Sequence, residues 1–164
     1  MAASICASCG LRTEAQAGLP TPPVLAAHEC WAAFGRLTAY GLERGWADFP
    51  HQHAVDAYAV QHPGPPGKPI TLWFGLVGLH LAFEHGWTGR RVQVAHWRLA
   101  KTSRQGPDMD VAGRGTALTI GYVLDASPGL ERDSALLEWA GSVWESVAPL
   151  HDAVAAALPS LHRL

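Results

Sequence analysis

The chain has 164 residues, of which 48% are hydrophobic, and its formal net charge is −2. This length and composition predict one domain, residues 1–164, with enough apolar material for a buried core. The slightly acidic balance argues against nucleic acid as a partner, because domains that bind it usually carry an excess of basic residues. The longest apolar run, 70–83, is too short to span a membrane, which takes about 20 residues.

We expect a cytoplasmic protein. The N-terminus shows no signal-peptide pattern, in which a basic region precedes an apolar one. All three cysteines lie within the first 30 residues of the chain. Three thiols cannot form a closed disulfide set, so their distribution favours metal ligation in a reducing compartment over a secreted disulfide scaffold.

Apolar residues recur with helical spacing along most of the chain, and they predict an all-α fold. We interpret residues 1–20 as a cysteine-bearing extension with a zinc knuckle, and 21–164 as a bundle of about five helices. The expected helices are 24–44, ended by Gly45; 49–61, capped by Asp48; 69–85, ended by Gly86; a short one at 119–125; and a long last helix from 131, kinked at Pro149. Residues 90–103 fit either a short helix or a strand, and the helix is favoured.

The predicted helix 69–85 is apolar nearly all round, which is typical of a helix at the centre of a fold. Gly75 and Gly78 have no side chains, so one side of this helix leaves room for close packing. We therefore expect another helix to pack closely there.

The motif CASCG, residues 6–10, has the spacing of a metal knuckle. Two thiolates separated by two residues can turn toward one ion, and the glycine lets backbone N–H groups point at sulfur. Cys30 supplies a third thiolate. We expect the fourth ligand at the start of the next helix, facing Cys30 across an antiparallel pair. These positions predict a structural Zn²⁺ site of the Cys3His type, made by Cys6, Cys9, Cys30 and His51.

Two other interpretations of the cysteines stay open. In one, Cys6 and Cys9 are surface thiols and Cys30 is an ordinary core residue. In the other, the CxxC motif is a redox pair. The second is less favoured, because the motif does not lie at a strand-to-helix turn of an alternating β/α pattern.

The predicted helix from His51 carries many polar side chains beside an apolar stripe. Tyr58 shares a face with His62, four residues on, and also meets Gln61. Asp56 lies three residues from His53, and a carboxylate there can orient an imidazole. The functional interpretation is a small polar pocket in which His62 carries a proton or binds a metal and Tyr58 donates a hydrogen bond. The structural alternative is a buried hydrogen-bond network that caps the helix and fixes the loop after it. The candidate catalytic residues are Asp56, Tyr58, Gln61, His62 and, beyond the predicted kink, His151.

In this order the motifs resemble an uncharacterised bacterial domain family, known only as a domain of unknown function. The resemblance is carried by CxxCG at 6–10, Cys30-Trp31 and HxxxVDxYxxQHPG at 51–64, and it continues to 139–144. It implies that Cys6, Cys9, Cys30 and His51 form one conserved set, and that a second set consists of Asp56, Tyr58, Gln61, His62, Pro63, Gly64 and His151. Members often carry a histidine where this chain has Gly75, so a reaction that used that histidine is not implied here. The family has no assigned activity and names no substrate.

Three functions are compatible with these patterns. The favoured one is a zinc-stabilised helical bundle whose polar helix lines a site for a small ligand or a protein partner. Four protein ligands leave no open position on the ion, so its role would be structural. The alternative is a metal-dependent hydrolase or transferase with a catalytic ion held by His51, Asp56, His62 and His151. A third is a regulatory module that binds a protein through exposed tryptophans. The sequence does not decide whether the protein is an enzyme, and it leaves the oligomeric state open.

Overall fold

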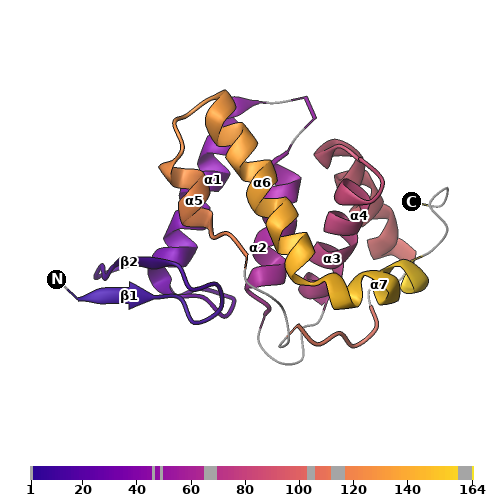
Figure 1. The fold of residues 1–164 in the computed structure, drawn as a ribbon, viewed down its shortest axis with the longest axis horizontal. Coiled ribbons are helices and arrows are strands. Elements are labelled where there is room, and N and C mark those ends of the chain that lie inside the picture. The colour runs from indigo at the N-terminus through magenta and orange to yellow at the C-terminus, as the bar shows by residue number, and fades with distance from the viewer. Residues whose placement is uncertain are drawn as a thin grey trace.

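The computed structural model describes residues 2–45, 47–48, 50–64, 70–102, 106–111, 117–158 and 164. Within these ranges the chain forms seven α-helices, one 3-10 helix and one two-stranded hairpin (Figure 1). The prediction of a mostly helical protein is confirmed. None of the helices in the described ranges is long and apolar enough to cross a membrane.

The cysteine-bearing extension contains a β-hairpin, which the sequence did not indicate. Strands β1 (Ala3–Ile5) and β2 (Arg12–Glu14) pair antiparallel, with Ala3 opposite Glu14 and Ile5 opposite Arg12. Strands of three residues are too short to display an alternating pattern that sequence inspection can detect. The connecting loop holds both cysteines of the CxxC motif, and Gly10 adopts a left-handed φ of 78° there.

The helices follow the predicted order, with shifted boundaries. They are α1 (His28–Arg44), α2 (His51–Gln61), α3 (Ile70–Phe83), α4 (Gly89–Thr102), α5 (Ile120–Asp125), α6 (Leu130–Ser146), the 3-10 helix Ala148–Leu150 and α7 (His151–Ala157). The count exceeds about five partly because the predicted last helix is divided where Pro149 lies in the 3-10 segment. Gly45 ends α1 in the left-handed conformation, as predicted.

Two predicted helix starts are wrong. Helix α1 begins at His28 and not at Val24, because Leu25 N–H donates instead to the carbonyl of Pro63, 3.2 Å away, and the backbone of 24–26 bends. Asp48 does not cap α2, whose N-cap position is Pro50 with no side-chain hydrogen bond. The predicted helix-end residues Phe49, Pro69 and Ser103 lie outside the described residues.

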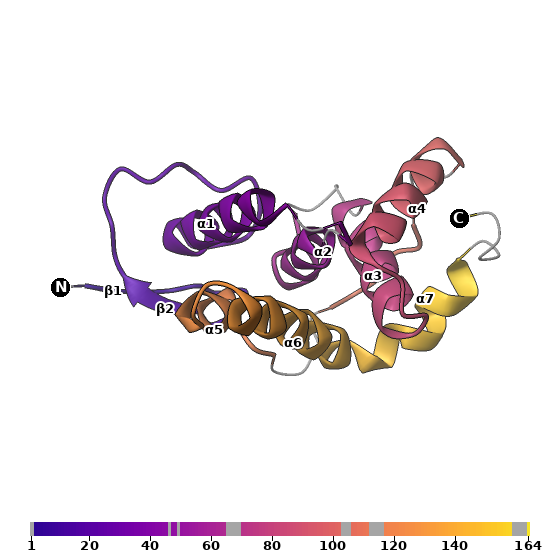
Figure 2. The same cartoon turned by 90° about the horizontal axis from the view of Figure 1, so that it is seen from above.

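Helix α3 lies at the centre of the fold, as predicted. It contacts α2, α4, α6 and α7 (Figures 1 and 2), and Leu76, Val77, Leu79 and Leu81 are completely buried in it. Helix α2 lies between α3 and α6 and also contacts α1 and α4. Polar side chains on α2 therefore face the protein interior on most sides.

The close approach of α2 and α3 depends on Gly75 and Gly78, as their spacing predicted. A Cβ atom at Gly75 would lie 2.9 Å from the backbone oxygen of Asp56. A Cβ atom at Gly78 would lie 2.0 Å from Oδ2 of the same residue. The Asp56 carboxyl group thus occupies the space that a side chain on α3 would take.

We predict that Gly78→Ala destabilises the protein by about 1–3 kcal/mol, because the added methyl group overpacks the α2–α3 contact. Gly35→Ala is the matched control, since a Cβ at this α1 position meets nothing within 4 Å. That change should stabilise by about 0.5–1 kcal/mol through the higher helix propensity of alanine. Urea denaturation of both variants measures the difference, and equal effects would contradict the packing described here.

Candidate metal centre

The antiparallel pairing of α1 and α2 brings the start of one helix beside the end of the other. Cys30 lies in the first turn of α1, and His62 is the C-cap residue of α2. At the opposite end of the pair, a Cβ atom on Gly41 would lie 3.2 Å from Nδ1 of His51. The two ends of α2 therefore meet opposite ends of α1.

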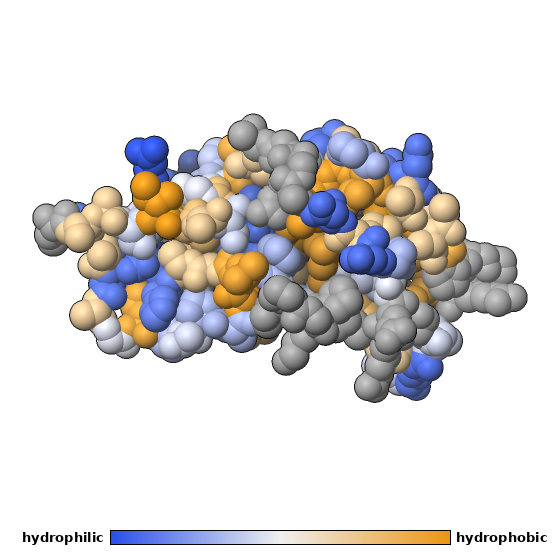
Figure 3. Space-filling view, turned by 90° about the horizontal axis from the view of Figure 1, so that it is seen from below, coloured by the Kyte–Doolittle hydropathy of each residue, from blue (hydrophilic) through white to orange (hydrophobic). Residues whose placement is uncertain are grey.

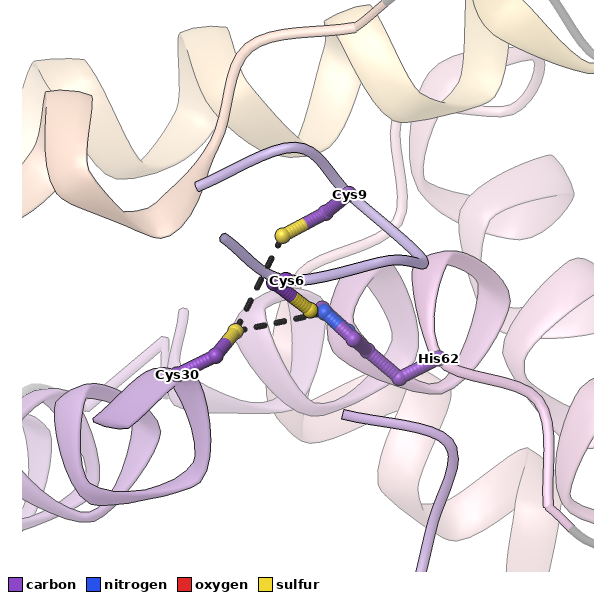
Figure 4. Close-up of side chains that lie close together, drawn as sticks. All are labelled: Cys6, Cys9, Cys30 and His62. Atoms are coloured by element: carbon purple, nitrogen blue, oxygen red, sulfur yellow. Dashed lines mark hydrogen bonds between the residues drawn. The ribbon is translucent and has the colours of Figure 1, made fainter. Parts of the chain in front are cut away.

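Three cysteines and one histidine converge where the hairpin loop meets this helix pair. Cys6 and Cys9 come from the loop, Cys30 from α1 and His62 from the end of α2, and their side chains point toward one another (Figure 4). One ligand atom from each of the four lies within 4.8 Å of all the others. No disulfide joins the cysteines. Cys6, Cys30 and His62 are buried, and Cys9 is partly exposed.

The prediction of His51 as the fourth member of this set is wrong in position, because the structure brings His62 there. Helix α2 has 11 residues and is therefore about 16 Å long at 1.5 Å per residue. His51 lies at the far end of that length. The prediction placed the starts of two antiparallel helices together, whereas antiparallel packing sets a start beside an end.

Local backbone geometry directs His62 at the thiols. The following Pro63 disfavours helical geometry, and His62 leaves the helix with φ −125° and ψ 70°. Its Nδ1 lies 3.1 Å from the carbonyl oxygen of Tyr58, and its Nε2 lies 3.3 Å from Sγ of Cys30. When Nδ1–H donates to that carbonyl, Nε2 keeps its lone pair toward the sulfurs. This is the tautomer in which histidine binds a metal through Nε2.

Tyr58 supports the imidazole and one sulfur. Its ring stacks on His62 with centroids 4.0 Å apart and on Phe34 at 4.1 Å. Its hydroxyl group donates to Sγ of Cys30 over 3.7 Å. Burial, followed by the nearby Cys30 sulfur, raises the pKa of Tyr58, so the phenol remains a donor. The predicted shared face of Tyr58 and His62 is confirmed.

The three thiols cannot all ionise together without a cation. Hydrogen bonds from Cys30 and then Cys9 lower the pKa of Cys6. The corresponding bonds to Cys6 and Cys9, and then burial, raise the pKa of Cys30. For Cys9, the bond with Cys30 lowers the pKa, but the bond with Cys6 and burial outweigh it and raise the pKa to about 11. A divalent cation would stabilise the ionised form of all three thiols together.

The spacing of the ligand atoms suits a tetrahedral ion. Metal–sulfur bonds of about 2.3 Å and metal–nitrogen bonds of about 2.0–2.1 Å place two sulfurs about 3.8 Å apart, and sulfur and nitrogen about 3.6 Å apart. The Cys9 and Cys30 sulfurs are 3.7 Å apart, and Cys30 Sγ is 3.3 Å from His62 Nε2. These two separations are near the tetrahedral values and all four ligand atoms lie within 4.8 Å of one another, so the group is suitable for a metal ion.

Glu29 also docks the hairpin on α1, and sequence reasoning missed it. Its carboxylate accepts hydrogen bonds from Ser4 Oγ at 2.7 Å and from the backbone N–H of Gln16 at 2.9 Å. The Gln16 and Ser4 bonds lower the pKa of this carboxyl group. The available signal was an acidic residue in the first turn of a helix, directly before a proposed ligand.

The remaining polar residues of α2 point to separate places. Gln61 donates to the carbonyl of Leu118 at 2.8 Å and accepts from Trp139 Nε1 at 3.0 Å, so it links α2 to α6 and to the segment before α5. Asp56 accepts from Gln52 at 3.0 Å and faces α3 and α4. Its predicted pairing with His53 does not occur, because His53 lines a different cavity, beside Phe83 and Trp87.

His151 does not join the polar residues of α2. Its ring stacks on Trp144 with centroids 3.7 Å apart, and its Nε2 lies 3.0 Å from the carbonyl oxygen of the same tryptophan. Its Nδ1 is 4.0 Å from Glu84 Oε1. The predicted approach of His151 to the central cluster is therefore wrong.

The four clustered residues lie within a stretch of sequence that matches a known family. The chain belongs to DUF5946, a family of unknown function. The family model matches residues 4–148, which confirms the resemblance drawn from the motifs. All four clustered residues of this DUF5946 protein lie inside the match, and His151 lies beyond it. No curated protein and no solved structure matches the chain.

We predict that one Co²⁺ per chain binds at the cluster and gives the absorption bands of tetrahedral thiolate coordination. His62→Ala should weaken this binding by roughly 100-fold or more, because it removes a ligand. His51→Ala is the matched control at the other end of α2 and should leave the spectrum unchanged. Titration followed by visible absorption measures both, and loss of the bands only in the His51 variant would reverse the assignment.

The buried His53 should make stability depend on pH. Burial lowers its pKa from 6.5 to about 4, and within the described part of the chain its Nδ1 has no hydrogen-bond partner. Between these values the unfolded state binds the proton and the folded state does not, so His53 removes stability as pH falls below 6.5. Relative to His53→Leu, the wild type should lose about 2 kcal/mol between pH 7 and 5. Urea denaturation at both pH values tests this, and a constant difference would show that folding does not shift the pKa of His53.

Proposed function

We propose that this protein is a zinc-stabilised binding protein, in which Zn²⁺ fixes the N-terminal hairpin to α1 and α2. The observation that carries the proposal is the convergence of three thiols and one imidazole from three separate segments of the chain. Soft thiolate ligands in tetrahedral array suit Zn²⁺. Four protein ligands leave no coordination position for a substrate, so the ion would be structural.

The hairpin needs such an anchor. Two strands of three residues each are not stable alone in water. Apart from the cysteines, the hydrogen bonds to Glu29 are the main polar ties from the hairpin region to α1 in the part of the chain that the structure describes. Zinc bound to ligands on both sides would couple the folding of the hairpin to that of the helices.

The metal-dependent hydrolase or transferase is the weaker candidate. It needs His51, Asp56, His62 and His151 around one ion. His62 lies with the cysteines, His51 near Gly41, and His151 against Trp144. We therefore favour binding over catalysis as the use of the remaining polar side of α2, with a small ligand in the cavity beside Asp56.

A protein partner bound through exposed tryptophans is also less favoured. Among the described tryptophans, Trp97 alone is largely exposed, at 61%, and the Lys101 ammonium lies 3.3 Å from its ring centroid. Where Figure 3 shows the surface in colour, hydrophobic residues form separate patches among hydrophilic ones. A large protein-binding surface would usually present one contiguous patch.

Metal removal tests the structural role. The purified protein should contain one Zn²⁺ per chain by elemental analysis. Chelation should raise hydrogen exchange most in residues 2–16 and less in α3 and α6, because α3 and α6 pack directly on α2 and on each other. Cys9→Ser should mimic chelation, and His51→Ala should not.

X-ray absorption at the zinc edge separates the structural from the catalytic role. Three sulfurs and one nitrogen support a structural ion, whereas a bound water in place of a protein ligand would reject that role. Unchanged exchange in residues 2–16 after complete removal of zinc would likewise reject the anchoring function.

A further inference from the structure

A cavity of about 410 Å³ opens between α2, α3 and α4, away from the cysteine cluster. Its size lies in the range of small-molecule sites. The wall is mainly apolar, and Gln52, Asp56, Thr71 and His96 add polar groups. Helices α2, α3 and α4 come together here (Figure 2).

The Asp56 carboxyl group in this wall lacks the partners that a buried carboxylate requires. Its side chain is 3% exposed. Among the described residues, its Oδ1 accepts one hydrogen bond, from Gln52 Nε2, and its Oδ2, which faces Gly78 of α3, accepts none. An ionised carboxylate has room for about four donors. Burial accordingly raises the pKa of Asp56 well above its usual range.

His96 does not supply the missing positive charge. Its Nδ1 is 3.8 Å from Asp56 Oδ1 and 3.4 Å from Gln52 Nε2. Burial lowers the pKa of His96 to about 4, so the ring is neutral near pH 7. Its Nε2 is also buried, and it has no hydrogen-bond partner among the residues that the structure describes. No lysine or arginine among the described residues forms an ion pair with Asp56.

We propose that this cavity binds a small organic ammonium ion, which pairs with Asp56 while its hydrocarbon part lies against Phe74, Val55 and Ala100. A primary ammonium group brings one positive charge and three donors, and these match the carboxylate, the neutral imidazole and the Gln52 amide oxygen after rotation of that amide. The face of Phe74 adds a favourable surface for a cation. This inference deepens the ligand-binding part of the proposed function and is independent of the zinc part.

The lining favours an organic cation over a metal ion. Asp56 is the one carboxylate in the described wall of the cavity. Calcium needs six to eight oxygen ligands, and magnesium needs six in near-octahedral geometry. The wall offers too few oxygen ligands for either ion, and its apolar side chains cannot bind a bare metal ion. An organic ammonium ion contacts both the polar side chains, through its charged group, and the apolar side chains, through its hydrocarbon chain.

The test uses zinc-loaded protein and n-butylammonium chloride, followed by isothermal titration calorimetry. The wild type should bind one equivalent saturably, while n-butanol, which has the same chain without the charge, should bind much more weakly. Asp56→Asn keeps the shape and removes the charge. It should weaken binding by roughly 30-fold or more, because one member of a buried charge pair is lost. Asp125→Asn, at an exposed carboxylate, controls for net charge and should bind like the wild type.

A second variant keeps the test independent of Asp56 stability. Ala100→Phe fills the cavity from α4 without touching the carboxyl group, and it should also abolish binding. The proposal is overturned if the wild type does not bind n-butylammonium saturably, if Ala100→Phe binds it normally, or if Mg²⁺ or Zn²⁺ competes for the same site with higher affinity. Hydrogen exchange of residues 2–16 in the same samples shows separately whether the zinc anchor is intact.

Discussion

The antiparallel register of α1 and α2 is the constraint on which the candidate metal centre depends. It sets the first turn of α1, with Glu29 and Cys30, against His62, the C-cap residue of α2. The backbone bond from Leu25 to Pro63 fixes the same junction. The hairpin loop then needs to bring only two sulfurs to complete a tetrahedral set. Three segments that are distant in sequence thus meet at a point that helix packing alone defines, and a metal ion there would join them covalently.

Helix α2 distributes its polar side chains around its axis and does not gather them into one site. Successive residues are separated by about 100° around an α-helix. Tyr58 therefore points about 200° away from Asp56, and His62 lies near Tyr58, four residues on. The Tyr58–His62 face meets the thiols, Gln61 meets α6, and Asp56 meets α3 and α4. A helix buried on several sides can support two distinct sites, whereas one pooled active site is excluded by its geometry.

Helical periodicity and glycine or proline punctuation were enough to predict most of the fold. The centre was predictable because α3 is apolar all round, and the end of α2 because Pro63 follows His62. The hairpin was not, since strands of three residues carry no readable period. The ligands Cys6, Cys9 and Cys30 were proposed from spacing alone, and the structure brings them together. The fourth ligand could be identified only by considering how the helices pack. In an antiparallel pair the start of α1 lies beside the end of α2, and this points to His62. For Glu29 the signal was weak, an acidic residue in the first helical turn beside a proposed ligand, because its role depends on a hairpin that the sequence did not indicate.

The two glycines of α3 connect packing to the chemistry of the cavity. Gly78 leaves room for the Asp56 carboxyl group, and Gly75 lets the α2 backbone approach. A larger residue at either position would push α2 outward and admit water to the carboxylate, which would then be solvated like any surface acid. With glycine there, the carboxyl group is held out of water beside an apolar wall and a neutral imidazole. An uncompensated charge in such a place is costly, and burial raises the pKa of Asp56, so a cation that brings its own donors would stabilise the ionised carboxylate. Close helix packing thus turns an ordinary aspartate into a selective site for positive charge, and it does so without contact with the cysteine cluster.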